Sequence, residues 1–354
     1  MPYRTSPMDD ATQVIDTIGG PDDDTPPRRR RTRRIVLIVL IVLAVVGGGS
    51  LLASGLYLNS VENRVGRVDA FTGIPEASRP SKAANGALNI LILGSDTRDP
   101  QATSGSRSDT IILAHLPKDR SSVQLISIPR DTWVHIPKAP NGKYGDTDAK
   151  INAAFAWGGV ALTVETIEQF TGVRIDNVAL VDFSGFKEIV DALGGIEINV
   201  EQDFTSTHSL NKDGHRTFHK GLQTMDGATA LDYARERYSF KDGDFARIRH
   251  QQQVIKAIVD KAASGGLLAN PARLNDFLKA TADAVTVDKT LSIFTMANDL
   301  RHLRSGSMHF YTSPSKGTGM VGDQSVVFAD RDKASRLFDA IRRDEPDEIS
   351  TILK

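Results

Sequence analysis

Short apolar runs alternate with longer helical patterns over most of the chain. Runs rich in Ile, Leu and Val and bounded by turn residues predict buried strands. These runs lie at residues 88–93, 110–116, 123–128, 178–182, 196–200 and 308–312. The second and third runs flank the turn sequence "PKDRSS", so we expect them to form a hairpin.

Helical periodicity with start and stop signals predicts helices between these strands. One spans residues 160–170 and stops at Gly172, and the next spans residues 185–193, capped by Ser184 and stopped by a Gly-Gly pair. Further helices are expected to begin near Asp226, Asp244 and Pro271, and a last one to span residues 333–342. Strands and helices in this mixed order indicate an α/β layered domain, and no internal repeat is visible.

A long apolar segment precedes these elements. Residues 35–58 carry no charge and are long enough to cross a hydrocarbon core of about 30 Å. Six arginines between Arg28 and Arg34 lie directly before this segment. Because positive flanking charge stays cytoplasmic, we expect a single-pass plasma-membrane protein with its N-terminus inside and the chain beyond Asn59 outside. A cleaved signal peptide is the alternative, but its apolar stretch is shorter, about 7–15 residues.

The anchor divides the chain into segments of different composition. The N-terminal tail contains "PDDDTPP" and little apolar periodicity, which is typical of disorder, and "SRPSKAANG" is a polar linker sequence. The arginine run also fits a nucleic-acid patch, although its place beside the span favours a topology determinant. The predicted organisation is a cytoplasmic tail with the arginine run (1–34), a transmembrane helix (35–58), a linker (59–87), an extracytoplasmic domain (88–345) and a C-terminal tail (346–354).

Composition narrows the classes of function. The 354 residues are 40% hydrophobic and 25% charged, which is enough for a substantial core. The formal net charge of −1 offers no global field for nucleic acid, so electrostatic function has to come from local clusters. The chain has no cysteine, which excludes disulfides, thiolate metal ligands and cysteine catalysis.

Acidic and basic residues meet where the predicted strands end. In "NILILGSDTRD", Asp96 follows the first strand, whereas Asp109 directly precedes the second and Arg130, in "SIPRD", directly follows the third. All three residues therefore belong to one edge of the sheet. If the hairpin folds about its turn, Asp109 and Arg130 lie opposite each other, although a one-residue slip in register removes this pairing.

A second charged segment is "ALDYARERYSFKDGDFARIRHQQQ". Arg235 and Arg237 point the same way only in an extended segment, so we expect the preceding helix to end near Tyr233. In the following helix, Asp244, Arg247 and Gln251 share one face. That face continues into the apolar stripe of Ile255 and Ile258, so these polar side chains are expected to point into the protein.

These charged residues form a set suited to a polyphosphate. Carboxylates bind a hard divalent cation, and guanidinium groups bind phosphate oxygens through pairs of hydrogen bonds. The alternative is a group of structural ion pairs at a solvated helix start, but an inward arginine is costly unless it has a partner. The five inward or co-directed arginines are Arg107, Arg130, Arg235, Arg237 and Arg247.

Other candidate motifs are weaker. His208, His215 and His219 include a pair at metal-ligand spacing, but the glycine-interrupted segment favours a surface loop over a zinc site. Phe155 and Trp157 fit either an acceptor platform or ordinary core packing, and we favour the core. Neither a G-x-S-x-G elbow nor a phosphate-binding G-x-x-x-x-G-K motif is present.

At these residues the chain resembles the LytR-CpsA-Psr family of membrane-anchored envelope phosphotransferases. The matching segments, in the family's order, are "NILILGSDTRD", "RSDTIILAHL", "SIPRDTWV", "KINAAFAWGG", "VDFSGFKEIVDALGGIEINV" and "LDYARERY…GDFARIRHQQ", from about residue 88 to residue 255. The resemblance implies an α/β fold with a central mixed β-sheet flanked by helices. It also implies a polyprenyl pyrophosphate ligand, with the lipid in an apolar groove and the pyrophosphate on magnesium and arginines.

The resemblance also implies roles for particular residues. Asp96 and Asp109 match the ligands of Mg²⁺ (or Mn²⁺). The implied pyrophosphate contacts are Arg107, Arg130, Lys150, Arg235, Arg237, Arg247 and Gln251. The implied catalytic residues are Asp96, Asp109, Arg130 and Asp244, with Asp244 one candidate for accepting the hydroxyl proton.

The implied activity is transfer of a cell-wall glycopolymer from a polyprenyl-pyrophosphate carrier to a peptidoglycan sugar hydroxyl. Its partners are then the lipid-linked glycopolymer, the peptidoglycan acceptor and the cell membrane, with no nucleic acid. A polyprenyl-pyrophosphate hydrolase and a non-catalytic lipid-binding envelope regulator remain as alternatives. A lipid carrier requires an elongated cavity, which we expect beside the helix with Phe186, Ile189, Val190 and Leu193.

Overall fold

The computed structural model describes residues 61–82, 86–95, 108–139, 142–207, 214–292, 296 and 305–353. The predicted cytoplasmic tail and transmembrane segment therefore lie outside the described residues, as do Asp96 and Arg107. Within the described ranges, no helix has the length and apolar character needed to span a bilayer.

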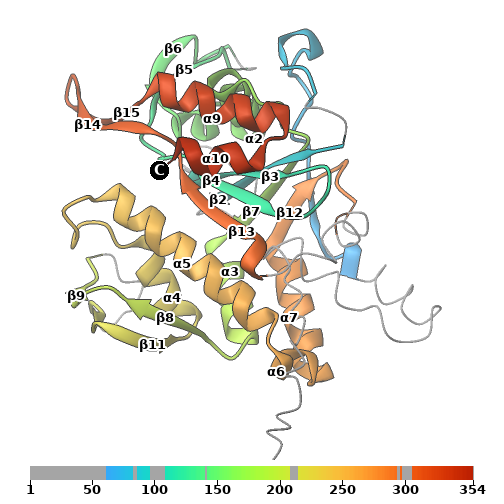
Figure 1. Ribbon diagram of the computed structural model, residues 1–354, viewed down its shortest axis with the longest axis vertical. Helices are drawn as coiled ribbons and strands as arrows, with labels where there is room; N and C mark the ends of the chain where they lie inside the picture. The colour runs from blue at the N-terminus through green and yellow to red at the C-terminus, as the bar shows by residue number, and fades with distance from the viewer. Residues whose placement is uncertain are drawn as a thin grey trace, which may run out of the picture. The chain divides into compact units, whose positions relative to one another are not determined.

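A seven-stranded mixed sheet forms the centre of the fold (Figure 1). Its strands, in spatial order, are β1 (Gly66–Val68), β12 (Val285–Asp288), β7 (Asn177–Asp182), β2 (Leu88–Ser95), β3 (Ser108–Leu116), β4 (Val123–Ser127) and β13 (Met308–Thr312). Strand β2 pairs parallel with β7 and antiparallel with β3, and β3 and β4 form the predicted antiparallel hairpin. The α/β class with a central mixed sheet is therefore confirmed.

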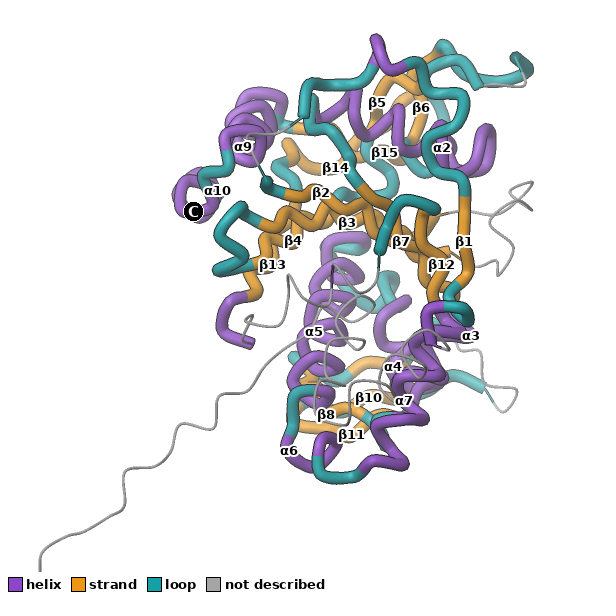
Figure 2. The backbone as a smooth tube through the Cα atoms, turned by 90° about the vertical axis from the view of Figure 1, so that its right-hand side faces the viewer, coloured by secondary structure: helices purple, strands orange, loops and turns teal. Residues whose placement is uncertain are grey.

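Helices cover both faces of this sheet, as Figure 2 shows with the sheet seen nearly edge-on. One face carries α3 (Phe183–Ala192), α4 (Gly227–Arg235), α5 (Asp244–Ala262) and α7 (Pro271–Ala284), and the other carries α2 (Ala153–Thr171), α9 (Arg331–Arg343) and α10 (Pro346–Ile352). Successive strand residues point to opposite faces, so Ile90 packs in the first core and Leu91 in the second. Two apolar cores therefore hold the sheet from either side.

Four two-stranded ribbons and short helices complete the described structure. The ribbons are β5 (Trp133–Ile136) with β6 (Thr147–Lys150), β8 (Ile196–Val200) with β11 (Gly221–Met225), β9 (Phe204–Thr205) with β10 (Thr217–Phe218), and β14 (Ser315–Val321) with β15 (Gln324–Ala329). The short helices are α6 (Gly265–Leu268), η2 (Glu76–Ser78) and η3 (Ser305–Ser307). Of these elements, the sequence pattern predicted only the strand at residues 196–200.

The predicted helices are present, with corrected ends. The predicted cap Ser184 is wrong, because α3 begins earlier and its N-cap is Asp182, whose carboxylate accepts a hydrogen bond from the Gly185 amide. Helix α2 begins at Ala153 rather than residue 160 and kinks at Gly158 and Gly159, where helical dihedral angles break.

The predicted domain boundaries are too narrow. The segment expected to be a linker contributes strand β1, which pairs with β12 at the edge of the central sheet, and Val61 and Val65 are buried in the core. The segment expected to be a C-terminal tail forms α10, and its Ile349 is fully buried. Both segments contain too few consecutive apolar residues to predict a strand or helix, but their isolated apolar side chains are buried in the cores of the domain.

Candidate functional site

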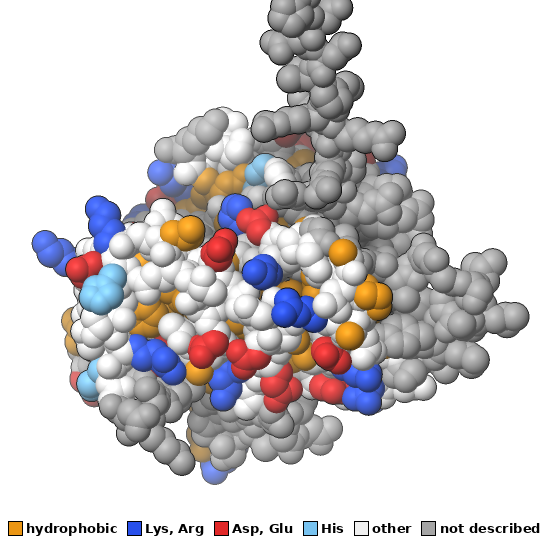
Figure 3. Space-filling model, turned by 90° about the horizontal axis from the view of Figure 1, so that it is seen from below, with side chains coloured by type: hydrophobic (Ala, Val, Ile, Leu, Met, Phe, Trp, Pro, Cys, Tyr) orange, Lys and Arg blue, Asp and Glu red, His pale blue; other side chains and the backbone are white. Residues whose placement is uncertain are grey.

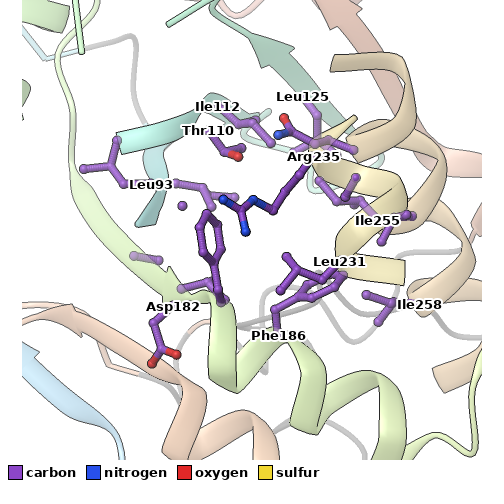
Figure 4. Close-up of a pocket in the computed structure, with 18 residues that line it drawn as sticks. Leu93, Thr110, Ile112, Leu125, Asp182, Phe186, Leu231, Arg235, Ile255 and Ile258 are labelled. Carbon is purple, nitrogen blue, oxygen red and sulfur yellow. The ribbon is translucent and has the colours of Figure 1, made fainter. Parts of the chain in front are cut away.

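An apolar cavity lies between the central sheet and the helices on one of its faces (Figure 4). It has a volume of about 980 Å³ including its open mouth. Residues of β2, β3, β4 and β7 form one wall, and residues of α3, α4 and α5 form the other. The labelled apolar side chains of the wall are Leu93, Ile112, Leu125, Phe186, Leu231, Ile255 and Ile258.

This cavity lies beside α3, where the sequence predicted an apolar space, with one difference in its lining. Phe186 lines it, whereas Ile189, Val190 and Leu193 are buried in the core and are not part of its wall. Helix α5 contributes four side chains to the cavity wall. They lie on one face of the helix because their spacing is helical: Gln251, Val254, Ile255 and Ile258.

The few polar groups of the cavity include Arg235 and Gln251. Arg235 is the last residue of α4, two residues beyond the predicted helix end, and Figure 4 shows its side chain extending into the cavity. Its guanidinium carbon lies 4.9 Å from the ring centroid of Phe183, at the start of α3. An amphiphilic ligand with an apolar body and an anionic end fits this distribution of groups.

A cluster of charged side chains gathers at the sheet edge. We call it the charged cluster: Asp109, Arg130, Asp131, Lys150, Asp244 and Arg247. Arg130 forms an ion pair with Asp109, which confirms the expected register of the hairpin. The Arg130 Nε atom also lies 3.8 Å from carboxylate oxygens of Asp131 and of Asp244. Burial lowers the pKa of Arg130, but the charges of Asp109 and Asp131 outweigh burial and raise it overall, so Arg130 stays charged.

The first turn of α5 brings Asp244 and Arg247 into this cluster. Their side chains are 8% and 5% exposed, and an Arg247 Nη atom lies 2.5 Å from an Asp244 oxygen. Burial raises the pKa of Asp244 and lowers the pKa of Arg247. Beyond this ion pair, the Asp244 carboxylate and the Arg247 Nε atom make no hydrogen bond with a described residue. Buried polar atoms of this kind are available to a ligand.

Lys150 and Asp131 complete the cluster from the opposite side of the sheet. The Lys150 Nζ atom, at the end of β6, lies 3.4 Å from an Asp131 oxygen. The sequence analysis missed Asp131, although its place directly after Arg130 at a strand end was the available signal. Arg237 lies outside α4, with its guanidinium carbon 4.4 Å from the ring centroid of Tyr238. Arg235 and Arg237 therefore contact different aromatic rings.

Of the remaining candidates, Asp96, Arg107 and His208 lie outside the described residues, whereas His215 and His219 are exposed on the surface and do not join this site. The described ranges hold no group of three or more His, Cys, Asp or Glu side chains placed to bind a metal ion. Phe155 is fully buried and Trp157 stacks on Tyr144 with ring centroids 5.9 Å apart.

Charge is dispersed on the face seen from below. On the visible part of the face drawn in Figure 3, acidic and basic side chains are interspersed and neither sign forms one large patch. The charged cluster is a local feature at the strand ends, and its Arg247 lies one helical turn before Gln251, which lines the apolar cavity.

Comparisons with known proteins agree with this architecture. The model of the LytR_cpsA_psr family matches residues 60–343. The cell wall biosynthesis protein LcpA of Corynebacterium glutamicum is 30% identical over 84% of this chain and 64% of its own length. The polyisoprenyl-teichoic acid–peptidoglycan teichoic acid transferase TagU of Enterococcus faecalis is 34% identical over 67% of this chain and 72% of its own. The chain thus spans about two thirds of these relatives.

A solved structure gives the same result for the fold. The crystal structure of Bacillus subtilis TagV aligns with a TM-score of 0.57 and 28% identity, over 75% of this chain and 97% of that chain. The family model covers most of the chain, and relatives and fold agree with it. The chain belongs to the LytR_cpsA_psr family.

Proposed function

We propose that this protein transfers a glycopolymer from a polyprenyl-pyrophosphate carrier to a sugar hydroxyl of peptidoglycan, forming a phosphodiester. The observation that carries this proposal is the apolar cavity with Arg235 in its wall, on the same face of the sheet as the buried ion pair of Arg247 and Asp244. A prenyl chain needs shelter from water, and its pyrophosphate needs cations at the point where the chain ends. The printed name of the similar TagU describes the same kind of transfer.

The charge balance of the cluster favours an anionic ligand. Arg130, Lys150 and Arg247 balance the three aspartates of the cluster, Arg237 adds a further positive charge nearby, and Arg235 shares the cavity wall with Asp182. Arg237 acts on the Asp244 carboxylate through its charge. The negative charge of a pyrophosphate is neutralised by this surplus of positive charge. Each guanidinium can donate two hydrogen bonds to phosphate oxygens.

We assign Asp96 and Asp109 as ligands of Mg²⁺ or Mn²⁺. The support is chemical: Asp109 is a partly exposed carboxylate whose partner Arg130 belongs to the charged cluster. Magnesium usually binds one or two carboxylates together with phosphate oxygens and water, so two protein ligands suffice. When bound, the ion neutralises phosphate charge. Asp109→Ala is expected to abolish the metal dependence of lipid-pyrophosphate binding, and unchanged dependence contradicts the assignment.

The charged cluster also orients the reacting groups. The acceptor hydroxyl oxygen attacks the phosphorus next to the glycopolymer, and the bond from that phosphorus to the bridging oxygen breaks. Polyprenyl phosphate leaves with the electron pair, and Asp244 accepts the hydroxyl proton. Arg130 and Arg247 stabilise the charge on the phosphoryl oxygens in the transition state. The raised pKa of Asp244 makes it a better proton acceptor than an ordinary aspartate.

The proposal places this chemistry outside the cell, in a plasma-membrane protein anchored by residues 35–58 with a cytoplasmic N-terminus. The support is the arginine run before the apolar segment. A reporter that is active only in the cytoplasm, fused after Lys354, is expected to be silent. Strong reporter activity there contradicts both the topology and the envelope location.

Product identity tests the function. The full chain in detergent is incubated with a defined polyprenyl-pyrophosphate glycan, magnesium and peptidoglycan oligomers, and products are identified by mass spectrometry. We expect a phosphodiester adduct of glycan and peptidoglycan together with polyprenyl phosphate. Free glycan phosphate in place of the adduct indicates a hydrolase, and unchanged donor indicates a non-catalytic lipid-binding regulator.

A further inference from the structure

A second and separate groove lies among the elements that cover the other face of the central sheet. It is lined by residues of β5, β15, the C-terminal end of α2 and one side of α9, elements that lie together at the top of Figure 1. Its volume is about 1400 Å³ including its open mouth, and none of its lining residues belongs to the apolar cavity. We call it the α9 groove.

Aromatic and hydrogen-bonding side chains alternate along the α9 groove. Trp133, Phe170 and Phe328 contribute rings, and Phe328 is 39% exposed despite its size. Gln169 and Ser335 contribute an amide and a hydroxyl. This mixture differs from the apolar cavity and suits a ligand with flat apolar faces and many polar groups, which describes a saccharide chain.

The charge of the groove points to an acidic ligand. Arg331 and Arg342 line it, and no Asp or Glu is among its described lining residues. His135 also lines it but lies 3.6 Å from Asp146 and 3.4 Å from Asp148, so the positive charge of the groove comes from the two arginines. Arg342 pairs with Asp339 and donates a hydrogen bond to the Thr171 carbonyl. In contrast, Arg331 is exposed and forms no ion pair with a described residue. Its guanidinium is therefore available to a carboxylate.

The α9 groove is connected to the charged cluster through the backbone. Trp133 of the groove pairs in register with Lys150 of the cluster across the β5–β6 ribbon. Val327 directly precedes Phe328 in β15, and its amide donates a hydrogen bond to the carbonyl of Asp131. Because adjacent strand residues rise about 3.3 Å, Trp133 lies only about 7 Å along the chain from Asp131. The α9 groove and the charged cluster are therefore neighbours along these strands.

We propose that the α9 groove binds the acceptor of the transfer reaction, an acidic amino-sugar chain of the kind found in peptidoglycan. This inference rests on the proposed function and deepens it. Trp133 and Phe328 stack on sugar rings, and Arg331 binds the lactyl carboxylate of an N-acetylmuramic acid that carries no stem peptide. The lipid donor and the acceptor then approach the charged cluster from opposite faces of the sheet, and the acceptor hydroxyl meets the phosphate there.

Binding of defined sugars without the donor tests this inference. The probe is a tetrasaccharide of alternating N-acetylglucosamine and N-acetylmuramic acid without stem peptides, titrated calorimetrically into the full chain in detergent. The neutral control is the tetrasaccharide of N-acetylglucosamine alone. Arg331→Ala is compared with Arg336→Ala, because Arg336 is also exposed on α9 but does not line the groove. Trp133→Ala is the second variant, and circular dichroism verifies that each variant is folded.

The acidic tetrasaccharide is expected to bind more tightly than the neutral one. Arg331→Ala weakens its binding about tenfold and removes its advantage over the neutral sugar, whereas Arg336→Ala has no effect. Equal binding by the wild type and both arginine variants overturns the inference, as does a groove that binds a protein partner and no sugar. If the sugar binds as expected but no transfer occurs with donor present, the proposed function fails and the binding site stands.

Discussion

Arg247 and Asp244 lie one turn apart on α5 and form a buried ion pair, and Gln251, one turn further along the helix, lines the apolar cavity. Removing one member of a buried pair leaves the other charge without a partner, which costs about 3–5 kcal/mol of stability. The exposed pair of Arg249 and Asp242, from the same region of the chain, contributes only about 0–1 kcal/mol. The two pairs form a matched comparison.

We predict that Asp244→Asn lowers both the rate of transfer and the free energy of unfolding. The rate falls by roughly 10²- to 10⁴-fold, because a general base is lost. Asp242→Asn, as the control, changes neither by much. Initial rates and denaturant unfolding measure the two effects. If both variants behave alike, Asp244 has no special role.

The two arginines after Tyr233 are predicted to bind through their guanidinium geometry and not through charge alone. Arg235→Lys and Arg237→Lys each keep the charge but lose the paired hydrogen bonds. We expect each to lower transfer by roughly one to three orders of magnitude, at about 1.4 kcal/mol per tenfold in rate. Arg249→Lys, in an exposed pair, is the control and keeps full activity. Full activity of all three variants refutes the assignment.

The apolar cavity is predicted to bind the prenyl chain. Ile255→Trp fills part of the cavity and is expected to raise KM for a long-chain donor more than for a short-chain donor. Lys256→Trp places the same ring on the exposed side of α5 and leaves both KM values unchanged. Competition between donors of two chain lengths gives the ratio directly. A parallel rise in both KM values argues for general damage to the fold.

His250 is predicted to make stability depend on pH. Its ring is fully buried, 4.3 Å from the Tyr233 ring and 4.7 Å from the Phe240 ring, and burial lowers its pKa in spite of the nearby Glu201. A lowered folded pKa means that the unfolded chain takes up the proton first as pH falls. The contribution of His250 is therefore complete above about pH 6.5 and is lost as pH falls towards its folded pKa.

His250→Phe is the test of this pH dependence. The free energy of unfolding of the wild type relative to this variant is expected to fall below pH 6.5, by at most about 1.4 kcal/mol per pH unit. His219→Gln alters an exposed histidine and keeps the wild-type slope. Identical slopes for all three proteins show that His250 has the same pKa in the folded and unfolded states.

The sequence was informative where a local period determined the geometry. The hairpin register predicted the contact of Asp109 and Arg130, and helical spacing predicted the shared face of Asp244, Arg247 and Gln251. Strand β1 could not be predicted in this way, because its three residues gain their place only by pairing with β12, more than 200 residues later.

Other parts of the site depend on packing between distant elements. Phe183 lies directly before the predicted helix cap in sequence, yet it lies against Arg235 because α3 and α4 are neighbours in space. The α9 groove combines β5 and β15, which are separated by most of the domain. No spacing rule along the chain relates such residues.

The central claim is that the site transfers a glycopolymer and excludes water until a sugar acceptor is bound. The most direct measurement is the rate of polyprenyl phosphate release by the full chain with a defined lipid donor, with and without peptidoglycan oligomers. Our account predicts release only when the acceptor is present, in equal amount to the phosphodiester product. Release at an undiminished rate without acceptor means that hydrolysis is the native reaction and contradicts the account.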